Sequence, residues 1–80
     1  MELKMLKQPS KYMKSLDKNT KKKLDKALYN LSSFNGNIIK LNKKNEYRYK
    51  IDHYRIIFFV DEENNIIVVK EINTRTNIKY

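Results

Sequence analysis

Residues 46–60 constrain the fold of this chain more than any other segment. Apolar and polar side chains alternate over residues 47–52, and the cations Arg48 and Lys50 occupy two successive polar positions. Side chains two residues apart on a strand point to the same face of a sheet. Arg48 and Lys50 would therefore project together, while the tyrosines between them occupy the other face. Arg55 opens a second strand after a tight turn, so three cations would gather on a patch that suits a polyanion.

The rest of the pattern predicts one α+β domain spanning residues 1–80. The expected elements are a strand at 2–7, a helix at about 9–16, a second helix capped by Asp17 or Asn19, a turn at Gly36, and strands at 38–41, 46–52, 54–61 and 66–73. The second helix carries an apolar stripe at helical spacing over residues 24–31. Residues 56–60 are continuously apolar, which is typical of a central strand covered on both faces. We therefore expect two N-terminal helices packed on a mainly antiparallel sheet of four to five strands.

Charge is the strongest compositional signal. Eighteen Lys and Arg against nine Asp and Glu give a net charge of +9, which would attract nucleic acid, the ribosome or an acidic protein. Fifteen of these cations are lysines, so a merely lysine-rich surface is the plain alternative. The chain has no cysteine, which excludes disulfides and thiolate metal sites. It also lacks an apolar run of ~18 residues that could span a membrane, and we expect a cytoplasmic protein.

Four segments carry a resemblance to a known family. They are Leu41, the basic strand at 47–51, the Tyr-Arg pair followed by an apolar strand at 54–58, and the tail at 72–78. In this order and spacing they resemble the RelE/ParE toxin superfamily of bacterial and archaeal toxin–antitoxin systems. The order of elements matches that superfamily across essentially the whole chain, and the resemblance implies the RelE-like fold.

The resemblance implies one of two activities. RelE-like members cleave messenger RNA in the ribosomal A site, whereas ParE-like members poison DNA gyrase and are not nucleases. Carried over by position, the RelE-like catalytic set would be Arg48, Lys50, Arg55, Arg75 and Tyr80. Three positions depart from the family pattern. Arg48 stands at a basic position that is often Lys, Thr74 stands where many members have His, and Lys79 separates Ile78 from Tyr80.

The residues fit a cleavage that needs no metal and no other cofactor. The chain has a single His and no cluster of metal ligands. Arginine stays protonated, so the three arginines would hold the phosphate and its developing charge rather than act as bases. Lys50 is then the candidate for proton exchange. The family resemblance implies that Tyr80 stacks on a base or assists proton transfer.

The sequence leads us to expect a ribosome-dependent endoribonuclease toxin. Its expected partners are a cognate RelB-like antitoxin, the ribosome and messenger RNA, with no membrane and no small-molecule cofactor. A ParE-like gyrase poison and a degenerate, non-toxic member that binds antitoxin remain alternatives. Locally, Arg55 would alternatively pair with Asp52 or Glu71, and Arg48 with Lys50 would form a solvated strand face. His53 is expected to be a turn residue.

Overall fold

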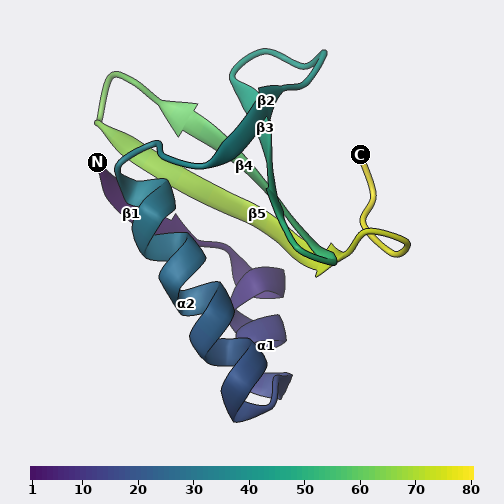
Figure 1. Cartoon of the computed structure of the whole chain (residues 1–80). Coiled ribbons are helices and arrows are strands. Elements are labelled where there is room, and N and C mark those ends of the chain that lie inside the picture. The colour runs from purple at the N-terminus through teal and green to yellow at the C-terminus, as the bar shows by residue number, and fades with distance from the viewer.

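The computed structural model describes all 80 residues, which form a strand, two helices and four further strands (Figure 1). The elements are β1 (Glu2–Met5), α1 (Lys7–Ser15), α2 (Lys18–Ser32), β2 (Asn37–Lys40), β3 (Glu46–Ile51), β4 (Tyr54–Asp61) and β5 (Ile66–Thr74). This order confirms the predicted α+β class. Neither helix is long and apolar enough to cross a bilayer.

The five strands form one sheet in the order β1-β5-β4-β3-β2. Strands β2 to β5 pair as antiparallel neighbours, whereas β1 pairs with β5 in parallel, with Glu2 opposite Ile66. Both helices lie on the same side of this sheet (Figure 1). The sheet is therefore mainly antiparallel, as expected, and its other side carries no helix.

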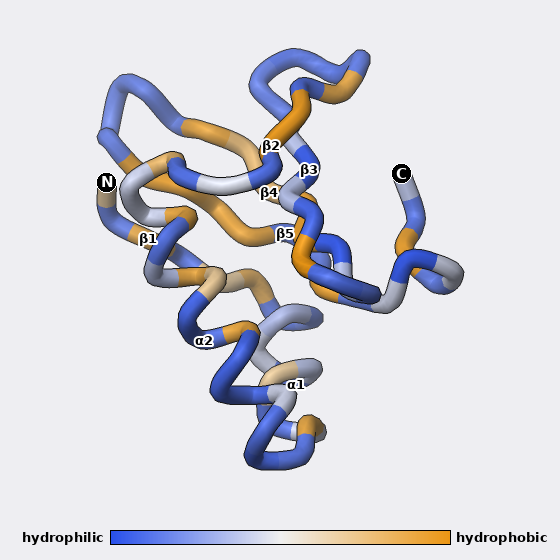
Figure 2. The backbone as a smooth tube through the Cα atoms, viewed as in Figure 1, coloured by the Kyte–Doolittle hydropathy of each residue, from blue (hydrophilic) through white to orange (hydrophobic).

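The core lies between the helices and the sheet. Asp17 caps α2, because its Oδ2 accepts a hydrogen bond from the Thr20 N–H at 3.2 Å. The helix then buries its predicted apolar stripe, Leu24, Ala27, Leu28 and Leu31. The sheet supplies the facing layer: Tyr49, Ile56, Phe58, Val60, Ile67, Val69 and Ile72. Figure 2 shows the same arrangement as an apolar band along β4 and β5 between hydrophilic loops and helix surfaces.

Several predicted boundaries differ from the structure by one or two residues. The first strand ends at Met5 rather than at residue 7, because Leu6 donates its N–H to Val69 and accepts from the Ser10 N–H. The first helix consequently begins at Lys7, and Pro9 falls in its first turn, where a missing N–H costs nothing. Strand β2 ends at Lys40 rather than at residue 41, since the Leu41 N–H donates to the carbonyl of Glu46 to close the β2–β3 loop.

Candidate functional site

The side of the sheet away from the helices, here called the open face, carries the predicted cations. Tyr47, Tyr49 and Ile51 belong to the layer that packs on the helices, so the alternate residues of β3 point to the open face. Lys50 lies directly opposite Arg55 on β4, and Arg48 lies opposite Ile57. The prediction that Arg48 and Lys50 share one face, with Arg55 beside them, is therefore confirmed.

The guanidinium of Arg55 is held over the β3–β4 turn. Its Nη1 donates to the carbonyl oxygens of Asp52 and Tyr54, each at 3.0 Å. It makes no ion pair with the carboxylate of Asp52 or Glu71. The alternative in which Arg55 pairs with Asp52 or Glu71 is therefore only partly right, because Arg55 contacts the backbone of Asp52 and not its carboxylate. The remaining N–H groups of this side chain form no hydrogen bond within the chain, which leaves them free to reach a phosphate.

Asp52 holds the turn itself and links it to α2. Its backbone is in the left-handed region, with φ of 55°, a conformation that Asp tolerates better than most residues. Its Oδ2 lies 2.9 Å from the Nζ of Lys23, and its Oδ1 lies 3.8 Å from Nε2 of the exposed His53. The hydrogen bond from Lys23, followed by the electrostatic influence of His53 and of Lys23, lowers the pKa of the Asp52 carboxyl. The same carboxylate raises the pKa of Lys23.

Arg48 occupies the middle of the open face with unsatisfied hydrogen-bonding capacity. Its side chain is half-buried, and its Nε is fully buried without any hydrogen-bond partner. Neither Arg48 nor the other two cations of the patch takes part in an ion pair within the chain. The other guanidinium nitrogens of Arg48 are not buried and also form no hydrogen bond within the chain, so they, rather than the Nε, are available to an external anion.

The segment after β5 folds back over the open face. Ile57 points to this face yet is only 3% exposed, and Ile78 in the tail is 9% exposed. The Lys79 N–H also donates to Oε2 of Glu71, the β5 residue opposite Ile57, at 3.4 Å. In Figure 1 the tail turns back along the sheet toward the β2–β3 loop. The second covered face expected for β4 is therefore supplied in part by the tail rather than by a helix.

The tail separates the two remaining predicted residues. The N–H of Arg75 donates to the His53 carbonyl at 2.8 Å, which fixes the backbone of Arg75 at the β3–β4 turn, near Arg55. Tyr80 instead lies at the start of β3, where it lines a pocket with Glu46. Glu46 and Lys50 are four residues apart, which corresponds to about 13 Å along a strand. The structure thus groups Lys50, Arg55 and Arg75 at one end of the open face and places Tyr80 at the other.

Glu46 is a residue of this face that the sequence reasoning did not identify. It is the one buried charged residue of the chain, 8% exposed, and its Oε2 lies 3.1 Å from the Nζ of Lys70. Lys70 is the β5 residue without a partner at the irregularity in the β4–β5 pairing, opposite the step between Ile57 and Phe58, and its Nζ lies 6.0 Å from the centroid of the Phe59 ring. The signal that could have found Glu46 is the same alternation that joins Arg48 and Lys50.

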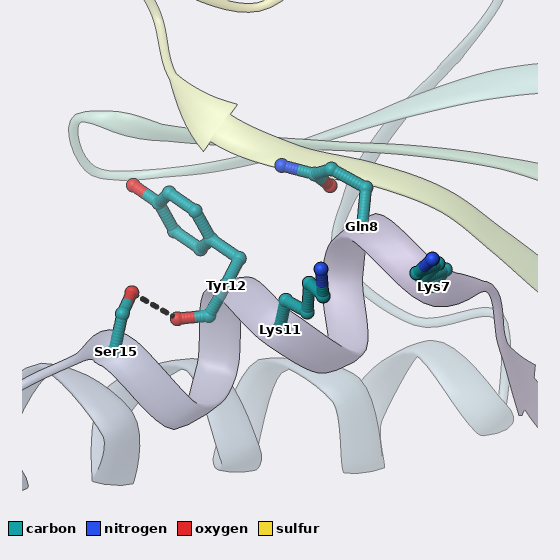
Figure 3. Close-up of a pocket in the computed structure, with 5 residues that line it drawn as sticks. All are labelled: Lys7, Gln8, Lys11, Tyr12 and Ser15. Atoms are coloured by element: carbon teal, nitrogen blue, oxygen red, sulfur yellow. Dashed lines mark hydrogen bonds between the residues drawn. The ribbon is translucent and has the colours of Figure 1, made fainter.

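The largest pocket of the molecule, about 560 Å³, lies elsewhere, along the outer side of α1. Figure 3 shows that Gln8 and Tyr12 point from this helix toward β5. The Gln8 amide forms two hydrogen bonds with the backbone of Ile72, at 2.8 Å and 2.9 Å. Burial and the neighbouring Tyr54 raise the pKa of the Tyr12 hydroxyl, so it stays protonated. These groups fasten the helix to the sheet and contribute nothing to the cationic patch.

The aromatic residues of the sheet mainly pack the interior, as predicted. The rings of Tyr47 and Phe58 stack with centroids 5.4 Å apart, and Phe34 meets both edge-on. Tyr49 is part of the core. His53 lies exposed in the β3–β4 turn, also as predicted. The chemistry open to this face is therefore the binding of a phosphate chain by Arg48, Lys50 and Arg55, with Tyr80 as the exposed aromatic.

The chain matches a known protein family. The family model described as the ParE toxin of the type II toxin–antitoxin system, parDE, matches residues 3–78. No curated protein sequence matches the chain significantly.

Several solved structures share the fold. The archaeal RelE–RelB complex from Pyrococcus horikoshii OT3 is similar with a TM-score of 0.77 and 21% identity, over 96% of this chain and 97% of that chain. The isolated E. coli RelE toxin gives a TM-score of 0.78 and 17% identity, over 91% and 82% of the two chains. The RelB–RelE complex from Methanococcus jannaschii gives 0.71 and 20% identity, over 91% of each chain.

Proposed function

Because this chain belongs to the RelE/ParE superfamily of type II toxin–antitoxin toxins, we propose that it is a ribosome-dependent endoribonuclease. It would cleave messenger RNA in the ribosomal A site without a metal or other cofactor. The observation that carries the proposal is the cluster formed by Arg48, Lys50 and Arg55 on the open face, with no ion-pair partner for any of them. The placement of Lys50 directly opposite Arg55 argues against a purely structural role, because like charges at opposed positions destabilise a sheet.

Each residue has a role that its position supports. Arg55 and Arg48 hold the scissile phosphate and stabilise its charge as the 2′-hydroxyl attacks. Lys50, exposed beside Arg55, exchanges the proton. Arg75 extends the phosphate contact at the β3–β4 turn, to which its backbone is bonded. Tyr80 lies too far along β3 to touch the same phosphate as Lys50, so its role is to stack on a flanking base.

The open face is incomplete as an independent nuclease. It offers cations and an aromatic ring, but it is a shallow sheet surface rather than a cleft, and the two pockets of the molecule lie at its edge and on α1. The ribosome would supply the missing part by holding the RNA in a reactive geometry. This is why we propose a ribosome-bound substrate rather than free RNA.

The natural inhibitor would be a cognate antitoxin similar to RelB. Related toxins of this fold are found in complexes with RelB proteins. A net charge of +9 on this chain favours an acidic partner segment that covers the open face. Folding of such a segment on binding would shield a large area of the toxin.

The match to the ParE family model favours a second candidate, a gyrase poison without nuclease activity. One pair of assays separates the two. The purified protein is added to a reconstituted translation reaction, where RNA 5′ ends are mapped, and to a gyrase supercoiling reaction. We expect new 5′ ends within codons and unchanged supercoiling. Blocked supercoiling with intact messages would replace the nuclease proposal by the gyrase one.

A further inference from the structure

A small pocket at the start of β3 remains unused by the proposed cleavage chemistry. It has a volume of about 240 Å³ and is lined by Leu41, Asn42, Lys43, Glu46 and Tyr80. Pockets for drug-sized ligands run from roughly 300 to 1,000 Å³, so this one suits a single planar ring system. Its wall is fixed by two backbone hydrogen bonds, from Leu41 N–H to Glu46 O at 2.8 Å and from Glu46 N–H to Lys43 O at 3.3 Å.

Glu46 gives the pocket its chemical character. Burying a carboxylate is unfavourable unless its oxygens are paired, and Lys70 pairs only Oε2. The second oxygen, Oε1, has no hydrogen-bond partner within the chain. A carboxylate only accepts hydrogen bonds, and its two oxygens have lone pairs for several donors. The pocket therefore selects a ligand that presents N–H groups.

We propose that this pocket binds an unpaired guanine base of the RNA, which rests on the proposed nuclease function for its substrate class. The Glu46 carboxylate would accept from guanine N1–H and N2–H₂, and the ring of Tyr80, 63% exposed at the pocket mouth, would stack on the base. Guanine is the one RNA base whose Watson–Crick edge presents two adjacent donors. The donors of adenine, cytosine and uracil lie next to acceptors, which a carboxylate repels.

The position of the pocket defines which nucleotide it reads. Glu46 lies about 13 Å along β3 from Lys50, too far for the base and the scissile phosphate to belong to the same linkage. Arg48 lies between the two ends on the same face. The RNA would therefore run along the open face past Arg48, with the guanine flanking the cleaved linkage. The pocket would set sequence preference without taking part in the reaction.

Binding of nucleotides can test this inference without any cleavage. The full chain, labelled with ¹⁵N and ¹³C, is titrated by NMR with guanosine, inosine and adenosine 5′-monophosphates. Guanosine monophosphate should shift the resonances of Leu41, Glu46 and Tyr80. Inosine monophosphate, which lacks the N2 amino group, should bind roughly tenfold more weakly, and adenosine monophosphate should leave the Glu46 resonances unmoved. Equal affinities, or shifts confined to Arg48, Lys50 and Arg55, would overturn the inference.

Variants separate recognition by Glu46 from mere stability. Glu46→Gln should remove the preference for guanosine over inosine monophosphate, whereas Glu2→Gln, at an exposed position on the edge strand β1 and away from the pocket, should keep it. If Glu46→Gln fails to fold, Tyr80→Ala, at an exposed position, takes its place. This variant should bind guanosine monophosphate about tenfold more weakly. Unchanged binding by Tyr80→Ala would refute the pocket. Guanine binding without message cleavage would support the guanine pocket and refute the nuclease proposal. Message cleavage without guanine binding would support the nuclease proposal and refute the guanine pocket.

Discussion

Lys50 and Arg55 face each other directly across β3 and β4 on the open face, although both are positively charged. Like charges at opposed positions destabilise a sheet. No carboxylate of the chain forms an ion pair with either of them. The pair therefore lowers the stability of the fold, which is the expected cost of a site held ready for an anion.

Reversing one of these charges should separate stability from activity. Lys50→Glu creates an attractive cross-strand pair with Arg55 and should raise the free energy of unfolding by about 0.2–1 kcal/mol. The same change should abolish message cleavage, because the phosphate would meet a carboxylate. Urea denaturation and mapping of RNA ends measure the two effects. Lys26→Glu, which makes the same charge change on the exposed side of α2, should retain cleavage. A Lys50→Glu variant that still cuts RNA would show that the site lies elsewhere.

Gly36 is required by the ring of Tyr49. It has φ of 134°, and a Cβ atom added there would lie 2.5 Å from Cε1 of Tyr49. Tyr49 is buried in the core and cannot move aside freely. Gly36→Ala should therefore reduce the free energy of unfolding by about 1–3 kcal/mol, measured by urea denaturation. Asn35→Ala, at the exposed neighbouring position, is the control and should change it little. Equal stability of the two variants would contradict the packing described.

Gln8 takes the place of a strand at the edge of β5 beyond β1. Its amide donates to the Ile72 carbonyl and accepts from the Ile72 N–H. Gln8→Ala leaves both backbone groups without a protein partner and should cost about 1–3 kcal/mol. Gln8→Glu still accepts from the N–H but cannot donate to the carbonyl, so its loss should be smaller. Thermal unfolding ranks the variants, with Lys11→Ala on the same helix as the control. A Gln8→Glu variant less stable than Gln8→Ala would be inconsistent with this clamp.

The ion pair between Lys23 and Asp52 should make stability depend on pH at both extremes. The pKa of Asp52 is lowered in the folded state, so its contribution is present above about pH 4 and is lost as the pH falls through the folded value. The pKa of Lys23 is raised, so its contribution is present below about pH 10 and is lost as the pH rises through the folded value. Between these limits the pair is intact.

Substitution of Lys23 checks this dependence. The difference in unfolding free energy between the parent and Lys23→Gln should be present at pH 7 and should shrink toward zero at about pH 2, below the usual Asp range. Urea denaturation at the two pH values measures it. Asp52→Asn, which also tolerates the left-handed backbone of the turn, should behave like Lys23→Gln and add nothing in the double variant. A difference that stays constant with pH would mean that the two charges do not interact.

The sequence allowed the fold to be predicted because local patterns and global arrangement agree. The apolar stripe of α2 and the alternation over 47–52 fix which sides of these elements face the core, and a one-residue slip of β3 would expose Tyr49. The parallel pairing of β1 with β5 could not be read from the chain, because periodicity identifies strands without naming their neighbours. The sequence also gave no sign that the tail covers Ile57.

The candidate site was predictable only where it lies on a regular strand. Arg48 and Lys50 follow from the period of β3, and Arg55 follows from the tight turn. Tyr80 belongs to an irregular tail whose path depends on contacts with Glu71 and the β2–β3 loop. Glu46 lies on the same face as the two cations, but its burial under Lys70 depends on a register irregularity in β5 that has no sequence signature.

The parallel pair of β1 and β5 also bears on how the protein is made. The first strand to be synthesised has its hydrogen-bonding partner in the last, so Glu2 must wait for Ile66 before the sheet can close. Pairings between such distant segments form late, because the intervening loop must be closed first. A growing chain can assemble its helices, but the open face acquires its final shape only once β5 has emerged. The cationic surface is therefore complete only after nearly the whole chain has been made.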